Sequence, residues 1–352
     1  MSNSQYWKEM LISTNDESNF QDIISTDQPI YKEKIKVLYS LCHSAQYEEI
    51  ISFIEKNNHT ISGNVTLLSQ SLMQSFRQLN SKFLLATDCQ NNKMVGFLLA
   101  IPLTIKVKDK YIVHGLTSFL CIHQALRKLG LAMQVIRKMT NIGYEQNIYC
   151  GYFVAPKSIG NNSFLISNWY RPLKIDKLEA IGFLPVAQNK RRQRLHYRPT
   201  WNNNYSINQV SDELASSSLE YYLELTKNKI FVYQPKIDEW SNWIKSFSTY
   251  IVKNKHNTIE GIFSIGTINI KSKETILKFD NLLLIAGQSS TLILQAVIYT
   301  SSADVLYGYL CGSLSKEIVE KNKCLIGKQQ LYFNLYNNAI KISVNDIMVP
   351  IW

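Results

Sequence analysis

Apolar positions along the chain follow two periods, and their alternation predicts a mixed α/β protein. Residues 32–53 and 66–78 carry apolar side chains at helical spacing and predict two helices. Residues 81–123 carry short apolar runs separated by tight turns, which predict antiparallel strands. A helix at 131–145 and a strand at 148–154 follow, so the strands continue into a strand-helix-strand crossover.

The second part of the chain follows a similar order of elements, although no sequence repeat is detectable. Helices are predicted at 208–227, 237–247, 287–299 and 313–320, and strands at 248–253, 258–270, 278–285, 304–309, 329–337 and 340–350. This similarity indicates a structural duplication. We therefore expect two α/β halves, residues 1–198 and 199–352, that share one interface.

The apolar segment 116–123 leads into a basic turn, which we define as residues 124–132. The turn contains Arg127, Lys128 and Gly130, and the predicted helix begins directly after it at Leu131. Glycine lets the backbone approach a bound group, and the free N–H groups at a helix start attract anions. The basic turn is therefore predicted to bind the phosphates of a cofactor, and its order is similar to the acyl-CoA-binding turn of N-acetyltransferases.

Composition favours a globular protein and limits the classes of site. The chain has 352 residues, of which 45% are hydrophobic and 18% charged. No apolar run approaches the roughly 18–20 residues that span a bilayer, and the N-terminus lacks the pattern of a secretory signal, so a cytoplasmic protein is expected. Cysteines and histidines are dispersed without ligand spacing, so no metal site is predicted.

The net charge of +11 suits an anionic partner. The densest basic run is Lys190-Arg191-Arg192-Gln193-Arg194, which is expected to form a solvated strand or loop. No nucleic-acid-binding motif accompanies it, so no specific nucleic-acid partner is expected, whereas transient contact with a membrane surface stays open.

Two features suggest acyl-transfer chemistry. If the strand before the basic turn bulges, the N–H groups of Phe119 and Leu120 can stabilise an oxyanion; otherwise both residues belong to a buried strand. The last six residues are apolar, which suggests a buried end. The carboxylate of Trp352 could then accept a proton near neutral pH, unless this segment only completes a sheet.

Colinear blocks of the sequence resemble the glycylpeptide N-tetradecanoyltransferases, or N-myristoyltransferases. The run Val95-Gly96-Phe97-Leu98-Leu99-Ala100-Ile101-Pro102 looks like the family's V-G-F-I-x-A-I-P, and Phe119-Leu120-Cys121-Ile122-His123 with Leu126-Arg127 looks like F-L-C-V-H-K-x-L-R. Trp169-Tyr170-Arg171-Pro172-Leu173 with Lys177-Leu178 is similar to Y-x-H-R-x-L-N-x-x-K-L, and Leu335-Tyr336-Asn337 to L-Y-N-W.

The resemblance implies two N-acetyltransferase-like halves with mixed, mainly antiparallel sheets flanked by helices and related by pseudo-twofold symmetry. It implies a monomer that transfers myristoyl from myristoyl-CoA to an N-terminal glycine amine by direct attack on the thioester, without a metal. By position, Phe119 and Leu120 form the oxyanion hole, and the carboxylate of Trp352 is the base. The implied cofactor-binding residues are Tyr6, Trp7, Phe119, Leu120, Cys121, Ile122, Arg127, Lys128, Leu129, Gly130, Leu131 and Ala132. The implied peptide-binding residues are Ser118, Phe153, Val154, Tyr336 and Asn337.

The sequence departs from the family pattern at several of these positions. Gly130 replaces an arginine of the basic turn, Ser118 an asparagine, Val154 a threonine and Asn338 a tryptophan, and the acidic loop has no counterpart near 47–60. Two alternatives therefore stay open. One is a diverged acyltransferase with another acyl length or a lysine acceptor, and the other is an inactive acyl-CoA-binding protein.

Overall fold

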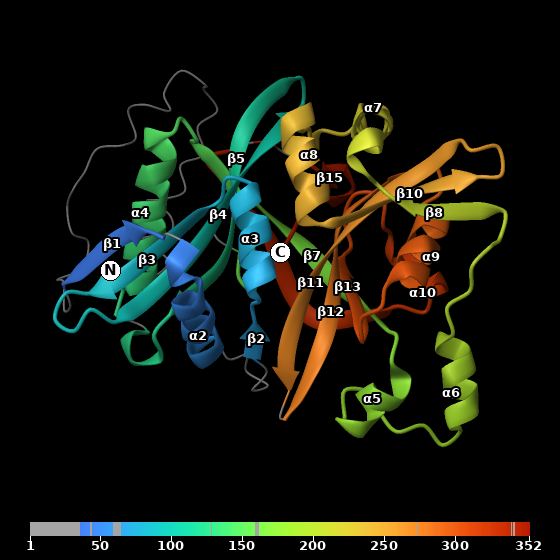
Figure 1. The fold of residues 1–352 in the computed structure, drawn as a ribbon, viewed down its shortest axis with the longest axis horizontal. Helices are drawn as coiled ribbons and strands as arrows, with labels where there is room; N and C mark the ends of the chain where they lie inside the picture. The colour runs from blue at the N-terminus through green and yellow to red at the C-terminus, as the bar shows by residue number, and fades with distance from the viewer. Residues whose placement is uncertain are drawn as a thin grey trace.

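The computed structural model describes residues 36–352 apart from 43, 59–64, 128, 159–161, 273, 339 and 341. Tyr6, Trp7 and Lys128 lie outside the described residues. Among the described residues, one long mixed sheet crosses the whole molecule, in the order β1-β3-β4-β5-β6-β14-β7-β13-β12-β11-β10-β8 (Figure 1).

The first part of the chain supplies the strands β1 (Val37–Leu41), β2 (Val65–Leu67), β3 (Lys82–Asp88), β4 (Met94–Val107), β5 (Lys110–Ile122), β6 (Cys150–Ala155) and β7 (Ser163–Pro172). Its helices are α2 (Tyr47–Asn57), α3 (Gln70–Gln78), α4 (Leu131–Glu145), α5 (Ile175–Ala180) and α6 (Lys190–Tyr197).

The second part supplies β8 (Tyr205–Gln209), β9 (Phe231–Tyr233), β10 (Ser248–Asn254), β11 (Ile259–Ser272), β12 (Thr275–Gly287), β13 (Val305–Tyr309), β14 (Leu325–Tyr336) and β15 (Ile347–Met348). Its helices are α7 (Ala215–Thr226), α8 (Ile237–Ser246), α9 (Ser290–Thr300) and α10 (Lys316–Lys321).

The same unit occurs twice in the sheet. Strands β4 and β5 have 14 and 13 residues, as do β11 and β12. Each hairpin is followed by a helix, α4 or α9, and then by a strand that pairs in parallel with the second hairpin strand. Each hairpin also has a register shift with one extra residue on its second strand. The described elements therefore have the duplicated, mixed α/β architecture that the order of predicted elements indicated.

The two units exchange strands across the sheet. β7 precedes residue 198 in the chain but pairs with β13, and β14 follows it but pairs with β6. The sheet is therefore continuous across the boundary predicted at residue 198, which stays a prediction.

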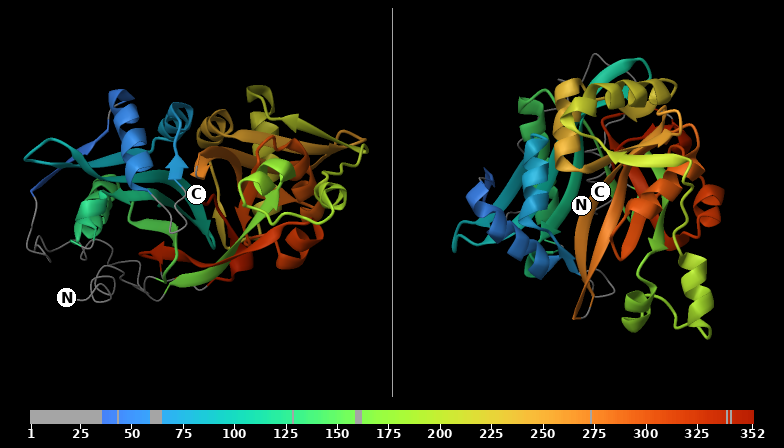
Figure 2. Two further views of the ribbon diagram at one scale, coloured as in Figure 1. Left: turned by 90° about the horizontal axis from the view of Figure 1, so that it is seen from below. Right: turned by 45° about the vertical axis from the view of Figure 1, so that its right-hand side comes forward.

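Four helices cover one face of the sheet in a row, and the chain end lies beneath them. Figure 2 shows α2, α3, α8 and α7 side by side above the sheet, with α4 on the opposite face. Each of these helices buries one stripe, as in α2, where Ile50, Phe53, Ile54 and Asn57 are buried at helical spacing. The C-terminus reaches the centre of the molecule, between the two units (Figures 1 and 2). No described helix is long and apolar enough to span a bilayer.

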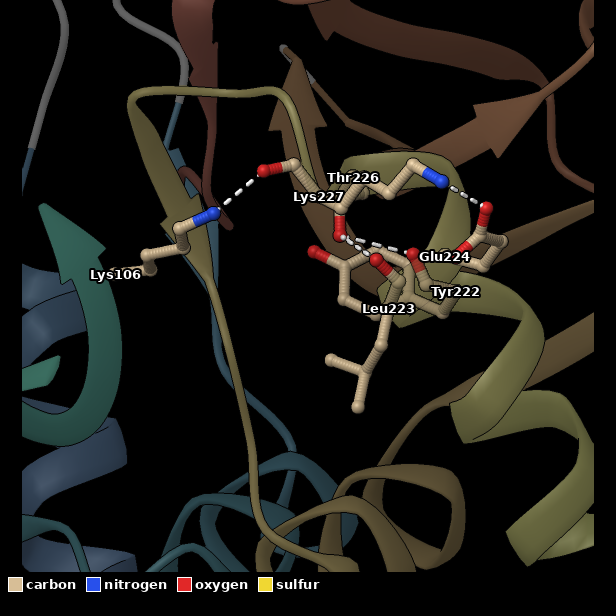
Figure 3. A network of polar contacts seen from close by, with 6 residues as sticks. All are labelled: Lys106, Tyr222, Leu223, Glu224, Thr226 and Lys227. Atoms are coloured by element: carbon tan, nitrogen blue, oxygen red, sulfur yellow. Dashed lines mark hydrogen bonds and ion pairs between the residues drawn. The ribbon is translucent and has the colours of Figure 1, made fainter. Parts of the chain in front are cut away.

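A polar contact joins the first hairpin to the end of α7 (Figure 3). The ammonium of Lys106, on β4, donates to the carbonyl of Lys227 directly after α7, where the helix dipole favours a positive charge. The Lys227 side chain pairs with Glu224, and the Thr226 hydroxyl donates to the Tyr222 carbonyl at 2.9 Å. The carbonyl groups at the end of α7 thus accept hydrogen bonds partly from side chains of the same segment and partly from Lys106 of the first hairpin.

Several expectations on secondary structure were wrong. Residues 32–53 do not form one helix, because Val37–Leu41 is an edge strand paired with β3 and α2 begins only at Tyr47. Of the described residues in the strand predicted at about 340–350, only Ile347–Met348 form a strand, since the segment instead passes through a helical turn at Val344–Asp346. The basic run forms helix α6 rather than a strand or loop, and Asn189 caps its start by accepting from the Arg192 N–H.

Candidate active site

A bulge interrupts β5 just before the basic turn. The pairing of β4 with β5 passes from Phe97–Cys121 directly to Leu99–Ser118, so two residues of β5, Phe119 and Leu120, face one residue of β4. Phe119 has φ +54°, in the left-handed region that costs a non-glycine residue about 1–2 kcal/mol. A bulge of this kind takes backbone groups out of the ladder and turns them away from the neighbouring strand.

The other edge of β5 opens at the same place. Its parallel pairing with β6 is confined to residues 114–116 and 150–152, and β6 continues by pairing with β14 instead. Among the described residues, no strand pairs with the β6 side of β5 beyond Leu116. Within the described part of the chain, the backbone groups at the bulge are therefore free of strand pairing on this edge of β5.

Two hydrogen bonds, one from β6 and one from β12, hold the last residues of the chain. The Tyr152 hydroxyl donates to the Pro350 carbonyl at 3.1 Å, and the Asn281 amide donates to the Ile351 carbonyl at 3.0 Å. Val349 and Ile351 are buried, whereas Trp352 is half-buried. The expectation of a buried, apolar end is confirmed for the residues before Trp352.

The Trp352 indole completes an aromatic cluster, which we define as Phe76, Phe119, Phe247 and Trp352. Its ring centroid lies 5.2 Å from that of Phe76, 5.4 Å from that of Phe247 and 6.4 Å from that of Phe119. On its far side the indole lies over Gly266 of β11, where an added Cβ would lie 2.4 Å from an indole carbon. The cluster therefore joins α3, the β5 bulge, the end of α8 and the second unit.

The basic turn leads into α4 as predicted. Gly130 is the N-cap of α4 with φ +87°, a conformation that favours glycine. No side chain caps the helix start and no acidic residue lies in its first turn. The first N–H groups of α4, which include those of Leu131 and Ala132, and the helix dipole can therefore serve an anion.

Arg127 makes contacts that the sequence did not predict. Its guanidinium donates to the carbonyl of Ile122 at 3.3 Å and to the carbonyl of Asn57, at the last turn of α2. The Asn57 side chain in turn accepts from the Gln124 N–H at 3.1 Å. Arg127 thus fixes the basic turn against α2. If it also binds a cofactor phosphate, it does so in addition to this structural role. Leu129, between Arg127 and Gly130, is exposed.

The predicted peptide-binding residues fall into two separate groups. Ser118 borders the bulge, and Phe153 and Val154 lie half-buried on β6, opposite Asn334 and Phe333. Tyr336 and Asn337 instead bond to Tyr144 of α4, with the two tyrosine hydroxyls 2.9 Å apart and the Asn337 amide 3.1 Å from the Tyr144 hydroxyl. These two residues hold β14 against α4, and their substrate role stays a prediction.

Comparison with known proteins shows which family the chain resembles. The family model for the N-terminal domain of myristoyl-CoA:protein N-myristoyltransferase matches residues 18–163. Glycylpeptide N-tetradecanoyltransferase from Dictyostelium discoideum is 24% identical over 51% of this chain and 51% of its own length. The Schizosaccharomyces pombe enzyme of that name is 24% identical over 74% of this chain and 57% of its own. Over residues 18–163 the chain thus resembles the N-myristoyltransferase family. It spans about half the length of these curated relatives.

Solved structures of the family have the same fold. Saccharomyces cerevisiae N-myristoyltransferase with bound myristoyl-CoA superposes with a TM-score of 0.80 at 15% identity, covering 100% of both chains. A second structure of that yeast protein with bound myristoyl-CoA gives a TM-score of 0.77 over 93% of this chain and 88% of the other. The N-acetyltransferase-like fold expected from the sequence resemblance is thereby confirmed.

Burial disfavours the ionised form of the thiols in and around the site. Burial raises the pKa of the Cys121 thiol to about 11, even though the Arg127 charge lowers it. Burial likewise raises the pKa of the Cys150 and Cys311 thiols to about 12. His114 is also unsuited to act as a base, because burial lowers its pKa to about 4. No cluster of possible metal ligands occurs among the residues that the structure describes.

Sequence reasoning missed three residues of the site: Phe76, Phe247 and Gly266. They come from α3, the end of α8 and β11, and they meet only because the two units fold against each other. A signal was present for Gly266 alone, since a glycine inside a long strand marks a close approach of another group.

Proposed function

We propose that this chain transfers a myristoyl group from myristoyl-CoA to the N-terminal glycine amine of a protein. The observation that carries the proposal is the left-handed bulge at Phe119, placed 6.4 Å from Trp352 between the ring centroids. The match of residues 18–163 to the N-myristoyltransferase family model and the fold shared with a yeast protein solved with bound myristoyl-CoA support the assignment.

The cofactor would lie along the first unit. Its phosphates would meet the N–H groups at the start of α4, where Gly130 leaves the backbone open and no acidic residue repels them. Cys121, Ile122 and Leu129 would border the same ligand, and its thioester carbonyl would reach the bulge where β5 and β6 diverge.

The reaction needs an oxyanion hole and a base. The glycine amine attacks the thioester carbonyl carbon, and the N–H groups of Phe119 and Leu120 donate to the oxygen that becomes negative. The carboxylate of Trp352 accepts the proton that the amine loses. When the tetrahedral intermediate collapses, the carbon–sulfur bond breaks and CoA leaves as a thiolate that takes up a proton. Ser118, Phe153 and Val154, around the bulge, would position the peptide.

Direct attack is favoured over a covalent enzyme intermediate. Cys121 is adjacent to the bulge, but its pKa of about 11 leaves almost no thiolate at neutral pH. The amine of an N-terminal glycine has an ordinary pKa near 8, so a weak base suffices.

The test is transfer between defined substrates followed by mass spectrometry. The protein is incubated with CoA esters of three acyl lengths and with three peptides: one starting with glycine, the same peptide N-acetylated, and one with an internal lysine. The proposal predicts acylation of the free glycine peptide by myristoyl-CoA and none of the acetylated one. Acylation at lysine, or preference for another chain length, would replace the proposal by the diverged acyltransferase. Binding of myristoyl-CoA without any product would identify an inactive acyl-CoA-binding protein.

The protein is further proposed to act as a monomer in the cytoplasm. All six cysteines are free thiols, as in a reducing compartment, which supports the second point. Light scattering after size-exclusion chromatography tests the first point, and fractionation of the source cells tests the second. A dimer or a secreted protein would contradict them.

A further inference from the structure

A basic helical segment projects from the sheet, far from the bulge. After β7 the chain leaves the sheet, forms α5 and α6, and returns at β8; Figures 1 and 2 show both helices standing outside the body of the molecule. We call residues 173–199 the basic projection. Nothing in the proposed reaction uses it.

Most positive charges of the basic projection have no carboxylate partner. Lys190, Arg191 and Arg192 are exposed, and no ion pair is found for them within the part of the chain that the structure describes. The ion pair that α6 does make joins Arg194 to Asp176 of α5 at 2.8 Å, with both side chains more than half exposed. The segment therefore holds a concentrated, uncompensated positive field.

Apolar side chains lie exposed among these charges. Val186 is 71% exposed and Leu195, within α6, is 59% exposed. Between the helices and the start of β13 lies a cavity of about 640 Å³. Its charged lining residues are Lys174, Lys177, Arg194, Arg198, Asp176 and Asp304, and its apolar ones include Leu195. Both carboxylates are paired, Asp304 with Lys177 and Asp176 with Arg194, so Lys174 and Arg198 leave the lining net positive. Positive charge, exposed aliphatic groups and a cavity thus occur on one projecting surface.

The geometry points to the basic projection as a docking surface for a bilayer rich in anionic phospholipid. The arginines and lysines would meet the lipid phosphates, while Val186 and Leu195 would enter the boundary between headgroups and acyl chains. The cavity, whose lining has more basic than acidic side chains, suits a single anionic headgroup. This inference is independent of the proposed acyl transfer, because neither the bulge nor Trp352 takes part.

A bilayer fits better than a nucleic acid, the other common polyanion. Single-stranded nucleic acids are held by bases stacked on accessible aromatic rings. The rings of the basic projection are engaged: Tyr197 lies under the guanidinium of Arg171 at 4.9 Å, and Phe183 packs against Tyr170 at 5.6 Å between centroids. Exposed aliphatic side chains, in contrast, gain nothing from a phosphate backbone.

Co-sedimentation with vesicles tests the inference. The full chain is mixed with phosphatidylcholine vesicles or with vesicles that also contain about 30 mol % phosphatidylserine, and the bound fraction is measured. Binding is expected only to the anionic vesicles. Because each basic residue near such a surface contributes about fivefold to partitioning, Lys190→Glu/Arg191→Glu/Arg192→Glu should lower the partition coefficient at least about tenfold.

The matched control is Lys36→Glu/Lys93→Glu/Lys255→Glu, which changes the net charge equally at exposed positions outside the basic projection. This control should retain most of the binding, and equal loss in both triple variants would overturn the site.

A second variant, Val186→Ser/Leu195→Ser, keeps every charge and should weaken vesicle binding several-fold while leaving binding to a heparin column unchanged. Unaltered vesicle binding by it, or binding of a single-stranded RNA in place of vesicles, would overturn the bilayer assignment. Thermal unfolding of each variant shows that it is folded.

Discussion

The ring of Trp352 lies 6.4 Å from the ring of Phe119, centroid to centroid, although the two residues are at the C-terminus and on a strand of the first unit. Phe76 contacts both rings, at 5.2 Å from Trp352 and 5.8 Å from Phe119. The last residue and the bulge are therefore parts of one packed cluster, and a change in either should be felt at the other.

Gly266 makes room for the Trp352 indole, so Gly266→Ala should disturb the site from the opposite unit. The added Cβ would lie 2.4 Å from an indole carbon, closer than atoms can pack, and the ring would have to move. We expect a loss of about 1–3 kcal/mol in the free energy of unfolding, typical of overpacking, and a marked fall in acyl transfer. Gly115→Ala is the control, because its Cβ would meet nothing nearer than 3.9 Å.

Urea unfolding and transfer assays of both variants measure the effect. Equal behaviour of the two would contradict the role assigned to Gly266.

Gly130 should be required for cofactor binding as well as for stability. Its φ of +87° strains any side chain, so Gly130→Ala should cost about 1 kcal/mol of stability and shift the first N–H groups of α4. The Kd for myristoyl-CoA, measured by calorimetry, should rise several-fold. Gly182 has φ +76° with nothing within 4 Å of an added Cβ, and it lies outside the site. Gly182→Ala should therefore lose similar stability with an unchanged Kd. If both variants bind the cofactor as the original chain does, the start of α4 does not hold the phosphates.

His114 should make the protein less stable in mild acid. It is fully buried on β5, its Nε2 lies 3.2 Å from the Asn338 amide, and burial lowers its pKa from 6.5 to about 4. Between these values the unfolded chain binds a proton that the native protein does not, so the stabilising contribution is complete above about pH 6.5 and falls as the pH drops toward 4. The loss at pH 5 should be about 2 kcal/mol relative to pH 7.5, measured by urea unfolding. His114→Gln should remove most of this dependence, whereas His123→Gln, at an exposed position, should retain it. A parallel pH profile in the two variants would be evidence against this role.

The sequence predicted local elements better than long-range pairing. The helix at 131–145 is observed at those bounds. Its start at Gly130 and the helical spacing of its apolar residues can both be recognised from neighbouring residues in the sequence. Residues 81–123 were predicted to form short strands, yet β4 runs from Met94 to Val107 through Pro102 without a break. That proline is tolerated because pairing with β3 ends at Ala100 and pairing with β9 begins at Ile105, so its missing N–H falls in a gap of the sheet.

The residues of the candidate site likewise fall into those that the local sequence indicates and those that depend on long-range contacts. Phe119, Leu120 and the basic turn are contiguous in the chain and could be identified by motif. Phe76 and Phe247 could not, because a buried aromatic residue on one helix carries no sign of its partner on another element. Arg127 was identified from the sequence, but its observed contact was not. A basic side chain in this turn suggested phosphate binding, whereas its hydrogen bond to the Asn57 carbonyl depends on where α2 ends.

The proposed role of the Trp352 carboxylate can be tested separately from the packing of the Trp352 indole. Adding a short Gly-Ser extension after Trp352 keeps the indole in the aromatic cluster but moves the carboxylate away from the bulge. Because a positioned base contributes about 10²–10⁴-fold to rate, kcat for the glycine peptide should fall by at least about 100-fold while the Kd for myristoyl-CoA stays the same. Trp352→Phe is the matched control, since it retains the carboxylate and an aromatic ring that can still contact Phe76, and it should keep most of the turnover. The extended chain should also recover activity as the pH rises through the ordinary pKa of the glycine amine, near 8, where the amine loses its proton without help. Full turnover by the extended chain at neutral pH would assign the base to another group.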